Sequence, residues 1–151
     1  MKPFRFSLEA ITTLREHDKE AALERYGKAV QQRQAQEKRL KEAKEQIEVM
    51  RQSIALCRTE GIIQHAQQEA FMQALKSKEE FRVKTEEVFA QTLTEERRQL
   101  DKFLEMKKRL EIILNLKDKR RSSHLSQEMS KEEKEVQDLF NSRYNLKKLQ
   151  Q

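Results

Sequence analysis

The chain has 151 residues, of which 36% are hydrophobic and 38% are charged, and its formal net charge is +6 at pH 7. Globular domains are usually about 45–50% apolar and about 25% charged. With only two glycines and one proline, this composition argues against a globular or sheet-containing domain and favours long helices joined by few turns.

The first predicted helix spans about residues 8–59. From Tyr26 to Cys57 the apolar residues recur at alternating spacings of three and four, which predicts a heptad seam. The seam residues are Tyr26, Ala29, Leu40, Ala43, Ile47, Met50, Ile54 and Cys57, with Arg33 and Gln36 as polar interruptions. Upstream, Leu8, Ile11 and Leu14 have helical spacing but a different phase, so we expect a stutter between Leu14 and Ala22.

The stretch FRFSLE before this helix predicts a helix start. Ser7 would be the N-cap, and Phe6 would pack on Ile11 as a hydrophobic staple. Phe4 lies beyond the staple, so it would either cover the seam near Leu114 or face a partner.

Gly61 predicts the turn, because glycine suits the left-handed position that follows a helix. The tip would span about residues 60–64 and the second helix about residues 65–145. The predicted seam of the second helix contains Phe71, Leu75, Phe89, Leu93, Leu100, Phe103, Leu110 and Leu114. From about Lys117 onward this helix would have no partner in its own chain.

The predicted fold class is therefore all-α: one domain, residues 1–151, forming a long antiparallel two-helix coiled coil (an α-hairpin) with an overhanging C-terminal helix. No run approaches the ~18 apolar residues of a membrane span. No apolar signal segment follows Lys2 and Pro3, and the single cysteine, Cys57, has no partner for an internal disulfide. We expect a cytoplasmic protein.

The sequence contains no pattern typical of catalysis. His17, His65 and His124 are far apart, and neither glycine belongs to a phosphate-binding loop. A two-helix hairpin also offers no concave pocket in which carboxylates would acquire shifted pKa values. We expect no catalytic, cofactor-binding or metal-binding residues and a protein that is not an enzyme.

Three surfaces are candidates for binding partners. The tip carries more apolar residues than one seam can bury, which indicates either a binding surface or closure of the hairpin end. A basic block, which is either a binding surface or a solvated face, contains Lys107, Lys108, Arg109, Lys117, Lys119, Arg120 and Arg121. The overhang is either a third surface or a frayed tail. Interleaved acidic residues make nucleic-acid binding the weaker interpretation of the basic residues.

The start FRFSLEAITTLREHDKEAAL resembles the FliJ family of the bacterial flagellar export apparatus, a type III secretion system. Members open with an F-x-F-x-L-E pattern and continue into an acidic, alanine-rich helix. The residues that carry the resemblance are Phe4, Phe6, Leu8, Glu9, Ile11, Leu14, Arg15, Glu16, Ala21 and Ala22. The glycine turn and the basic-then-acidic C-terminal region are also similar.

The resemblance implies a stalk that couples an export ATPase (FliI-like) hexamer to an export gate protein (FlhA-like), and possible handling of export chaperones. It implies protein transport for flagellum biogenesis and motility, in the cytoplasm at the inner face of the membrane, with no nucleic acid. By position, the gate contacts would be Met50, Phe71 and Leu75. The end that enters the ATPase ring would carry Phe4, Arg120 and Arg121. A YscO-type stalk of a virulence secretion system and a generic coiled-coil scaffold are the alternatives.

Overall fold

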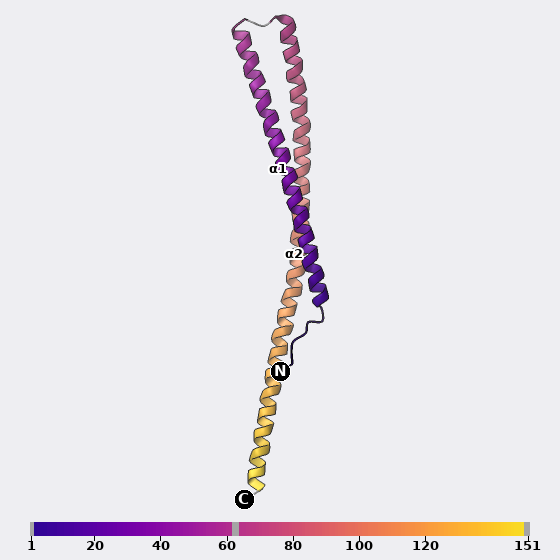
Figure 1. Cartoon of the computed structure of the whole chain (residues 1–151), viewed down its shortest axis with the longest axis vertical. Helices are drawn as coiled ribbons and strands as arrows, with labels where there is room; N and C mark the ends of the chain where they lie inside the picture. The colour runs from indigo at the N-terminus through magenta and orange to yellow at the C-terminus, as the bar shows by residue number, and fades with distance from the viewer. Residues whose placement is uncertain (1, 62–63, 150–151) are drawn as a thin grey trace. The chain divides into compact units, whose positions relative to one another are not determined.

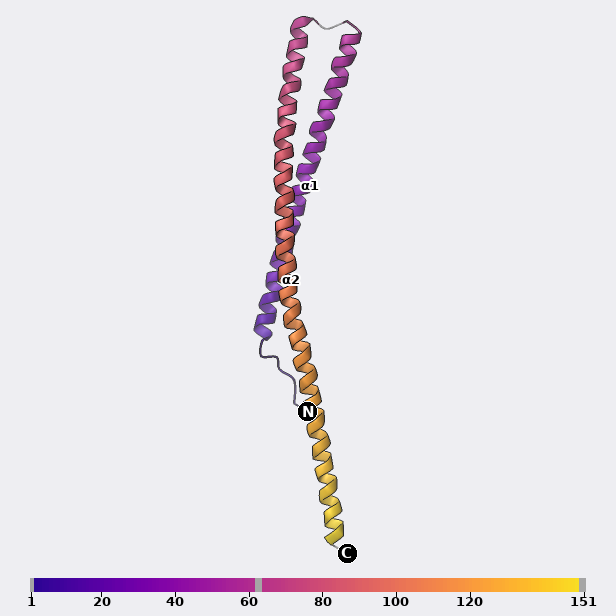
Figure 2. The same cartoon turned by 180° about the vertical axis from the view of Figure 1, so that it is seen from behind.

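The computed structural model describes residues 2–61 and 64–149, with side chains described as far as residue 145. Over these residues it contains two helices, α1 (Glu9–Thr59) and α2 (His65–Leu149), and no strand. The helices pack against each other in antiparallel directions (Figures 1 and 2). The α-hairpin predicted from the sequence is therefore confirmed.

The helices contribute to two compact units, which we describe separately. The turn unit contains Glu20–Leu104, and the terminal unit combines residues 1–19 with residues 105–151. Each unit therefore holds one part of α1 and one part of α2.

The turn begins at Gly61, as the sequence predicts. Its φ angle is +66°, in the left-handed region that side-chain-bearing residues rarely adopt. Its backbone N–H donates to the carbonyl of Arg58 at 3.3 Å, and the N–H of Glu60 donates to Leu56 at 3.1 Å. The predicted tip residues Ile62 and Ile63 lie outside the described residues.

The seam of α1 in the turn unit follows the predicted heptad. Its buried residues are Ala22, Ala29, Leu40, Ala43, Ile47 and Ile54. Tyr26, Met50 and Cys57 are half-buried at the predicted positions between them. Small and aliphatic side chains thus let the two helices approach along this stretch.

The predicted stutter between Leu14 and Ala22 is wrong. Thr12 is 3% exposed, whereas Ile11 and Leu14 are 40% and 55% exposed, so the seam continues in phase through Thr12 and Arg15. A buried threonine is tolerated here because its hydroxyl donates to the carbonyl of Leu8 at 3.2 Å. The heptad phase of α1 therefore runs unbroken from Thr12 to Cys57.

The seam of α2 is more polar than predicted. Thr85 and Gln99 are buried in it, while Phe71, Leu93 and Leu114, which the sequence placed there, are exposed. The hydroxyl of Thr85 donates to the carbonyl of Phe81 at 2.8 Å, so this residue too hides its polar group against its own helix. Polar residues therefore occupy positions that apolar periodicity alone would not assign to a seam.

A charged pair across the helices explains the polar interruption at Arg33, which donates through Nε to Glu96 at 2.6 Å. A second cross-helix pair, at an exposed position beside the seam, joins Arg51 to Glu79 at 2.5 Å. Next to the first pair, the rings of Tyr26 and Phe103 stack with centroids 6.5 Å apart. The Arg33 and Glu96 side chains are only 23% and 20% exposed, so a register that separated them would leave two partly buried charges unpaired and is disfavoured.

Gln99 generates a stability prediction. Its amide nitrogen donates to Glu95 at 2.7 Å, but its buried side-chain oxygen has no hydrogen-bond partner. An unsatisfied buried oxygen is destabilising, so Gln99→Leu is expected to raise the free energy of unfolding by about 1–2 kcal/mol. Urea unfolding followed by far-UV circular dichroism measures this change. Gln91→Leu, at an exposed position of the same helix, is the matched control; equal effects of both substitutions would contradict the prediction.

Candidate partner-binding surfaces

An N-terminal strap, residues 2–8, lies against α2 in the terminal unit. The ring of Phe6 lies beneath two cations: Lys117 Nζ is 5.9 Å and the Arg120 guanidinium 5.8 Å from its centroid. Phe4 contacts Phe6, with centroids 6.5 Å apart, and the ring of His124, at 5.6 Å. Cation–π attraction and ring packing therefore hold this helix-free segment on a basic stretch of α2.

The predicted N-cap at Ser7 is wrong, because the carbonyl that accepts the first helical hydrogen bond, from the N–H of Thr12 at 3.0 Å, belongs to Leu8. The hydroxyl of Ser7 instead accepts a hydrogen bond from Arg120 Nη1 at 3.1 Å, and Ile11, the predicted partner of Phe6, is exposed. Glu9, the first residue of α1, pairs with Lys117 at 2.8 Å. The first turn of α1 is thus anchored to α2 by charge, with Glu9 also favourably placed at the positive end of the helix dipole.

The far end of the strap is held by Glu128. The backbone N–H of Lys2 donates to one carboxylate oxygen at 3.2 Å, and Lys131 Nζ donates to the other at 2.8 Å. The hydrogen bond from Lys131, followed by that from the Lys2 amide, lowers the pKa of Glu128 to about 2. A carboxylate that is almost fully covered therefore remains charged and hydrogen-bonded through both oxygens.

These contacts correct two predictions. The region of α2 from Lys117 to Glu128 does have a partner in its own chain, because the strap covers it. Phe4 covers His124 and not the seam near Leu114. Every described side chain of α2 from Met129 to Asn145 is exposed.

The strap brings together two of the three residues assigned to the ATPase-facing end. Phe4 and Arg120 belong to the same cluster around Phe6, whereas Arg121 is exposed to solvent. Within the basic block, Lys117 is paired with Glu9 and Arg109 with Glu105, while Lys107 and Lys108 are exposed. Arg121 is therefore the predicted residue best placed to meet a partner without disturbing the strap.

The tip residues lie in the turn unit, where the helices diverge toward the turn (Figures 1 and 2). Met50 and Leu75 are half-buried and Phe71 is exposed. Leu56 and Met72 are also exposed, so closure of the hairpin does not bury the apolar tip. The tip therefore exposes several large apolar side chains, which suits a protein partner.

A hollow beside the tip contains residues that the sequence analysis missed. It lies between the two helices and is lined by Glu42, Glu45, Gln46, Val49, Met50 and Lys78. Lys78 donates to Gln46 at 3.2 Å and closes one edge, while Val49 is exposed. Val49 lies off the heptad seam, and the signal that could have found it is an apolar residue at a position where solvent-facing polar residues are the rule.

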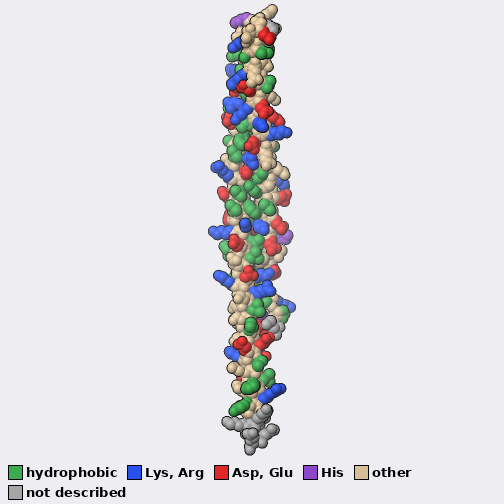
Figure 3. Space-filling view, turned by 90° about the vertical axis from the view of Figure 1, so that its left-hand side faces the viewer, with side chains coloured by type: hydrophobic (Ala, Val, Ile, Leu, Met, Phe, Trp, Pro, Cys, Tyr) green, Lys and Arg blue, Asp and Glu red, His purple; other side chains and the backbone are tan. Residues whose placement is uncertain are grey.

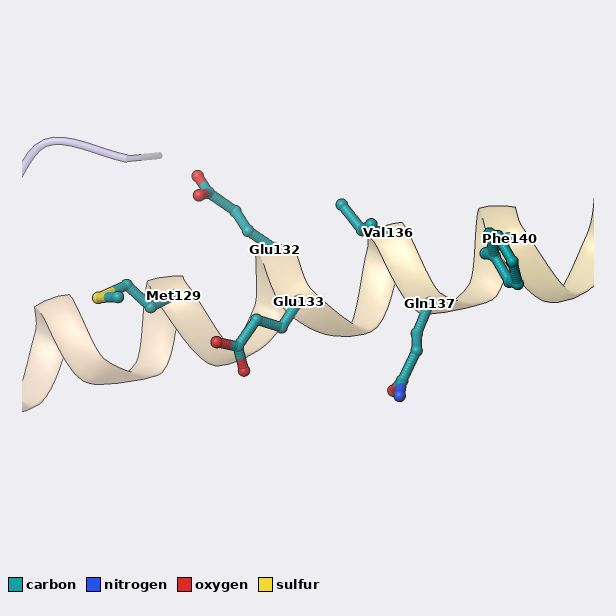
Figure 4. A pocket seen from close by; sticks show the side chains of 6 residues that line it. All are labelled: Met129, Glu132, Glu133, Val136, Gln137 and Phe140. Atoms are coloured by element: carbon teal, nitrogen blue, oxygen red, sulfur yellow. The ribbon is translucent and has the colours of Figure 1, made fainter.

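A second shallow hollow lies on the C-terminal part of α2 and is lined by Met129, Glu132, Glu133, Val136, Gln137 and Phe140 (Figure 4). The surface seen in Figure 3 otherwise alternates basic and acidic side chains between groups of hydrophobic ones. This end of α2 is thus an apolar surface on a single helix.

Within the residues that the structure describes, no group of three or more histidine, cysteine, aspartate or glutamate side chains could hold a metal ion. Neither helix, over its described residues, has a segment apolar enough to cross a membrane. Comparison with models of protein families, with curated proteins and with solved structures found no match.

Arg120 is expected to control the closed state of the strap. Arg120→Gln removes both the cation over Phe6 and the donor to Ser7, so tryptic cleavage after Arg5 should become about threefold to tenfold faster. Mass spectrometry of the released fragment measures this rate. Arg121→Gln, at the exposed neighbouring position, should leave the cleavage rate unchanged. If Ile11→Ala accelerated cleavage and Arg120→Gln did not, packing of Phe6 on Ile11 would be what holds the strap, and the prediction would be contradicted.

Glu128 gives the strap a defined pH dependence. The folded pKa of Glu128, about 2, lies below its usual value of 4.5. The stabilisation of the strap by the ionised carboxylate is therefore complete above pH 4.5 and is lost as the pH falls toward 2. The NMR shift of the Lys2 amide should therefore titrate with a midpoint near 2, and Glu128→Gln should abolish that titration. A midpoint near 4.5 in the unmodified protein would show that the carboxylate does not hold the strap.

Proposed function

We propose that this chain is a FliJ-type stalk of a bacterial flagellar type III export apparatus. One observation carries the proposal: the F-x-F-x-L-E segment, the most specific part of the resemblance, is the strap that packs on the basic stretch of α2. The antiparallel α-hairpin is also the fold that the resemblance implies.

In this proposal the terminal unit binds the export ATPase ring. Lys107, Lys108 and Arg121 present exposed positive charge there, which would steer the unit toward an acidic partner surface. The strap has a positioning role, because it holds Arg120 against Phe6 and the first turn of α1 against Lys117.

The turn unit would contact the export gate protein. Its exposed apolar tip supplies the kind of surface that protein partners bury, and Phe71 is exposed while Met50 and Leu75 are half-buried. Because α2 is continuous from His65 to Leu149, a contact at the ring could be transmitted along the helix toward the gate. A YscO-type stalk would share this architecture, and the two differ in which ATPase and gate they bind.

The experiment measures binding of the purified full-length chain to the flagellar export ATPase and, separately, to the cytoplasmic part of the gate protein. Arg121→Glu should weaken ATPase binding about tenfold or more at low salt, and the Arg120→Glu, Arg121→Glu double variant should weaken it further. Phe71→Ala with Leu75→Ala should weaken gate binding and spare ATPase binding. Circular dichroism checks that helicity is unchanged.

Arg97→Glu is the matched control, since Arg97 is an exposed arginine of the turn unit and its reversal changes the net charge equally. If Arg97→Glu weakened ATPase binding as much as Arg121→Glu, net charge would explain the effect and the assigned surface would be wrong. Binding to neither protein would reject the flagellar assignment, and binding to a virulence-system ATPase alone would favour the YscO-type stalk.

A further inference from the structure

Arg120 carries a guanidinium that the fold holds against uncharged partners. Within the described part of the chain it contacts the ring of Phe6, whose centroid is 5.8 Å away, and the hydroxyl of Ser7, which accepts from Nη1 at 3.1 Å. The residues three and four positions away on α2 are Leu116, Lys117, Ser123 and His124. None of them is acidic, so the helix supplies Arg120 with no neighbouring carboxylate.

Another arginine of α2 shows what Arg120 lacks. Arg98 donates to both carboxylate oxygens of Glu95, at 2.9 and 2.8 Å. A carboxylate brings the opposite charge and accepts two parallel hydrogen bonds from one guanidinium, whereas the hydroxyl of Ser7 is neutral and accepts a single bond from Arg120. A carboxylate that reached Arg120 would therefore be a stronger partner than its present ones.

The strap that occupies Arg120 is attached to α2 by side-chain contacts and one backbone N–H among its described residues. The Lys2 amide donates to Glu128 at 3.2 Å. The ring of Phe4 packs on that of His124. A surface segment held by a few such contacts opens locally more readily than a helix that packs along a seam. Removal of Arg120 from these contacts therefore favours opening of the strap.

We propose that Arg120 is a docking point for a carboxylate-rich protein surface, which takes the guanidinium from the strap and thereby opens the strap. Because strap and acidic surface compete for one guanidinium, each weakens the binding of the other by the same factor. Opening also releases the half-buried rings of Phe4 and Phe6 for contact with the partner. For the identity of this partner we rely on the proposed function, which assigns the acidic surface to the ATPase ring.

The charges around Arg120 favour an acidic protein surface over a nucleic acid. The same unit carries Glu9, Asp118 and Glu128 among its basic residues. A nucleic acid brings a phosphate charge at every nucleotide and would meet these carboxylates as well. Carboxylates on a folded protein can instead be placed to face Arg120 and the exposed Arg121 alone.

Tryptic cleavage after Arg5 in the full chain reports opening of the strap, and hexaglutamate is the acidic probe. At constant ionic strength, hexaglutamate should accelerate this cleavage about threefold or more in the unmodified chain and should have no effect in Arg120→Gln. Cleavage after Arg58, an exposed arginine near the turn, is the internal control for trypsin activity and should not change. Equal acceleration in Arg120→Gln, or none in the unmodified chain, would overturn the proposal.

The reciprocal effect is measured as the affinity of labelled hexaglutamate for the full chain. Phe6→Ala removes a ring from the strap and keeps every cation, so this variant should bind hexaglutamate about threefold or more tightly than the unmodified chain. Phe81→Ala, which truncates an exposed phenylalanine of the turn unit, is the matched control and should leave the affinity unchanged. Equal or weaker binding by Phe6→Ala would mean that the strap does not compete for Arg120.

Hexathymidylate in place of hexaglutamate separates the two kinds of anionic partner. It should accelerate cleavage after Arg5 less than hexaglutamate does, and an equal or larger acceleration would show that the assigned chemistry is wrong. The export ATPase is absent from all of these measurements. A strap that opens for hexaglutamate in a chain that does not bind the ATPase would contradict the proposed function alone, and the reverse result would contradict only the competition for Arg120.

Discussion

A single narrow seam between two helices is the constraint on which the rest of the structure depends. A two-helix hairpin has no third layer, so each position along the seam must bury its side chain against the facing helix alone. In the turn unit this is achieved with alanines and aliphatic residues on α1 and with Phe89, Phe103 and their polar neighbours on α2. The Arg33–Glu96 pair adds direction and register, which apolar contacts alone specify poorly.

In the terminal unit, fewer apolar residues are available to cover the facing side of α2. There the strap substitutes for a helix: it brings two phenylalanine rings, a hydroxyl and a backbone amide to the side of α2 that α1 no longer covers. An aromatic face suits this place because Lys117 and Arg120 lie over the Phe6 ring, and a cation packed on an aromatic ring keeps its charge near solvent. A basic stretch is thereby made part of an intramolecular contact.

Heptad periodicity correctly predicted the parts of the fold in which apolar side chains form the contact between the two helices. The α-hairpin, the glycine turn and the α1 seam from Tyr26 to Cys57 follow from heptad spacing and from the scarcity of glycine. Periodicity failed at Thr12 and Thr85, because a threonine that bonds to its own helix can be buried while its sequence signal remains polar. Ile11 and Leu14 produced the opposite error. The sequence assigns them to the seam because they are apolar, but their side chains lie beside it and remain exposed.

The candidate surfaces can likewise be divided into those that the sequence predicted and those that it did not. The exposed tip could be anticipated from an excess of apolar residues, but the strap could not, because the contact between Phe6 and Arg120 joins positions 114 apart in sequence (120 less 6) and follows no period. The geometry of the strap also shows that the residues of the basic block do not all have the same surroundings. Arg120 contacts the strap whereas its neighbour Arg121 is exposed, so substitutions at these two arginines are expected to have different effects on the strap. From Met129 to Asn145 every described side chain of α2 is exposed, so apolar residues such as Val136 and Phe140 lie at the surface there.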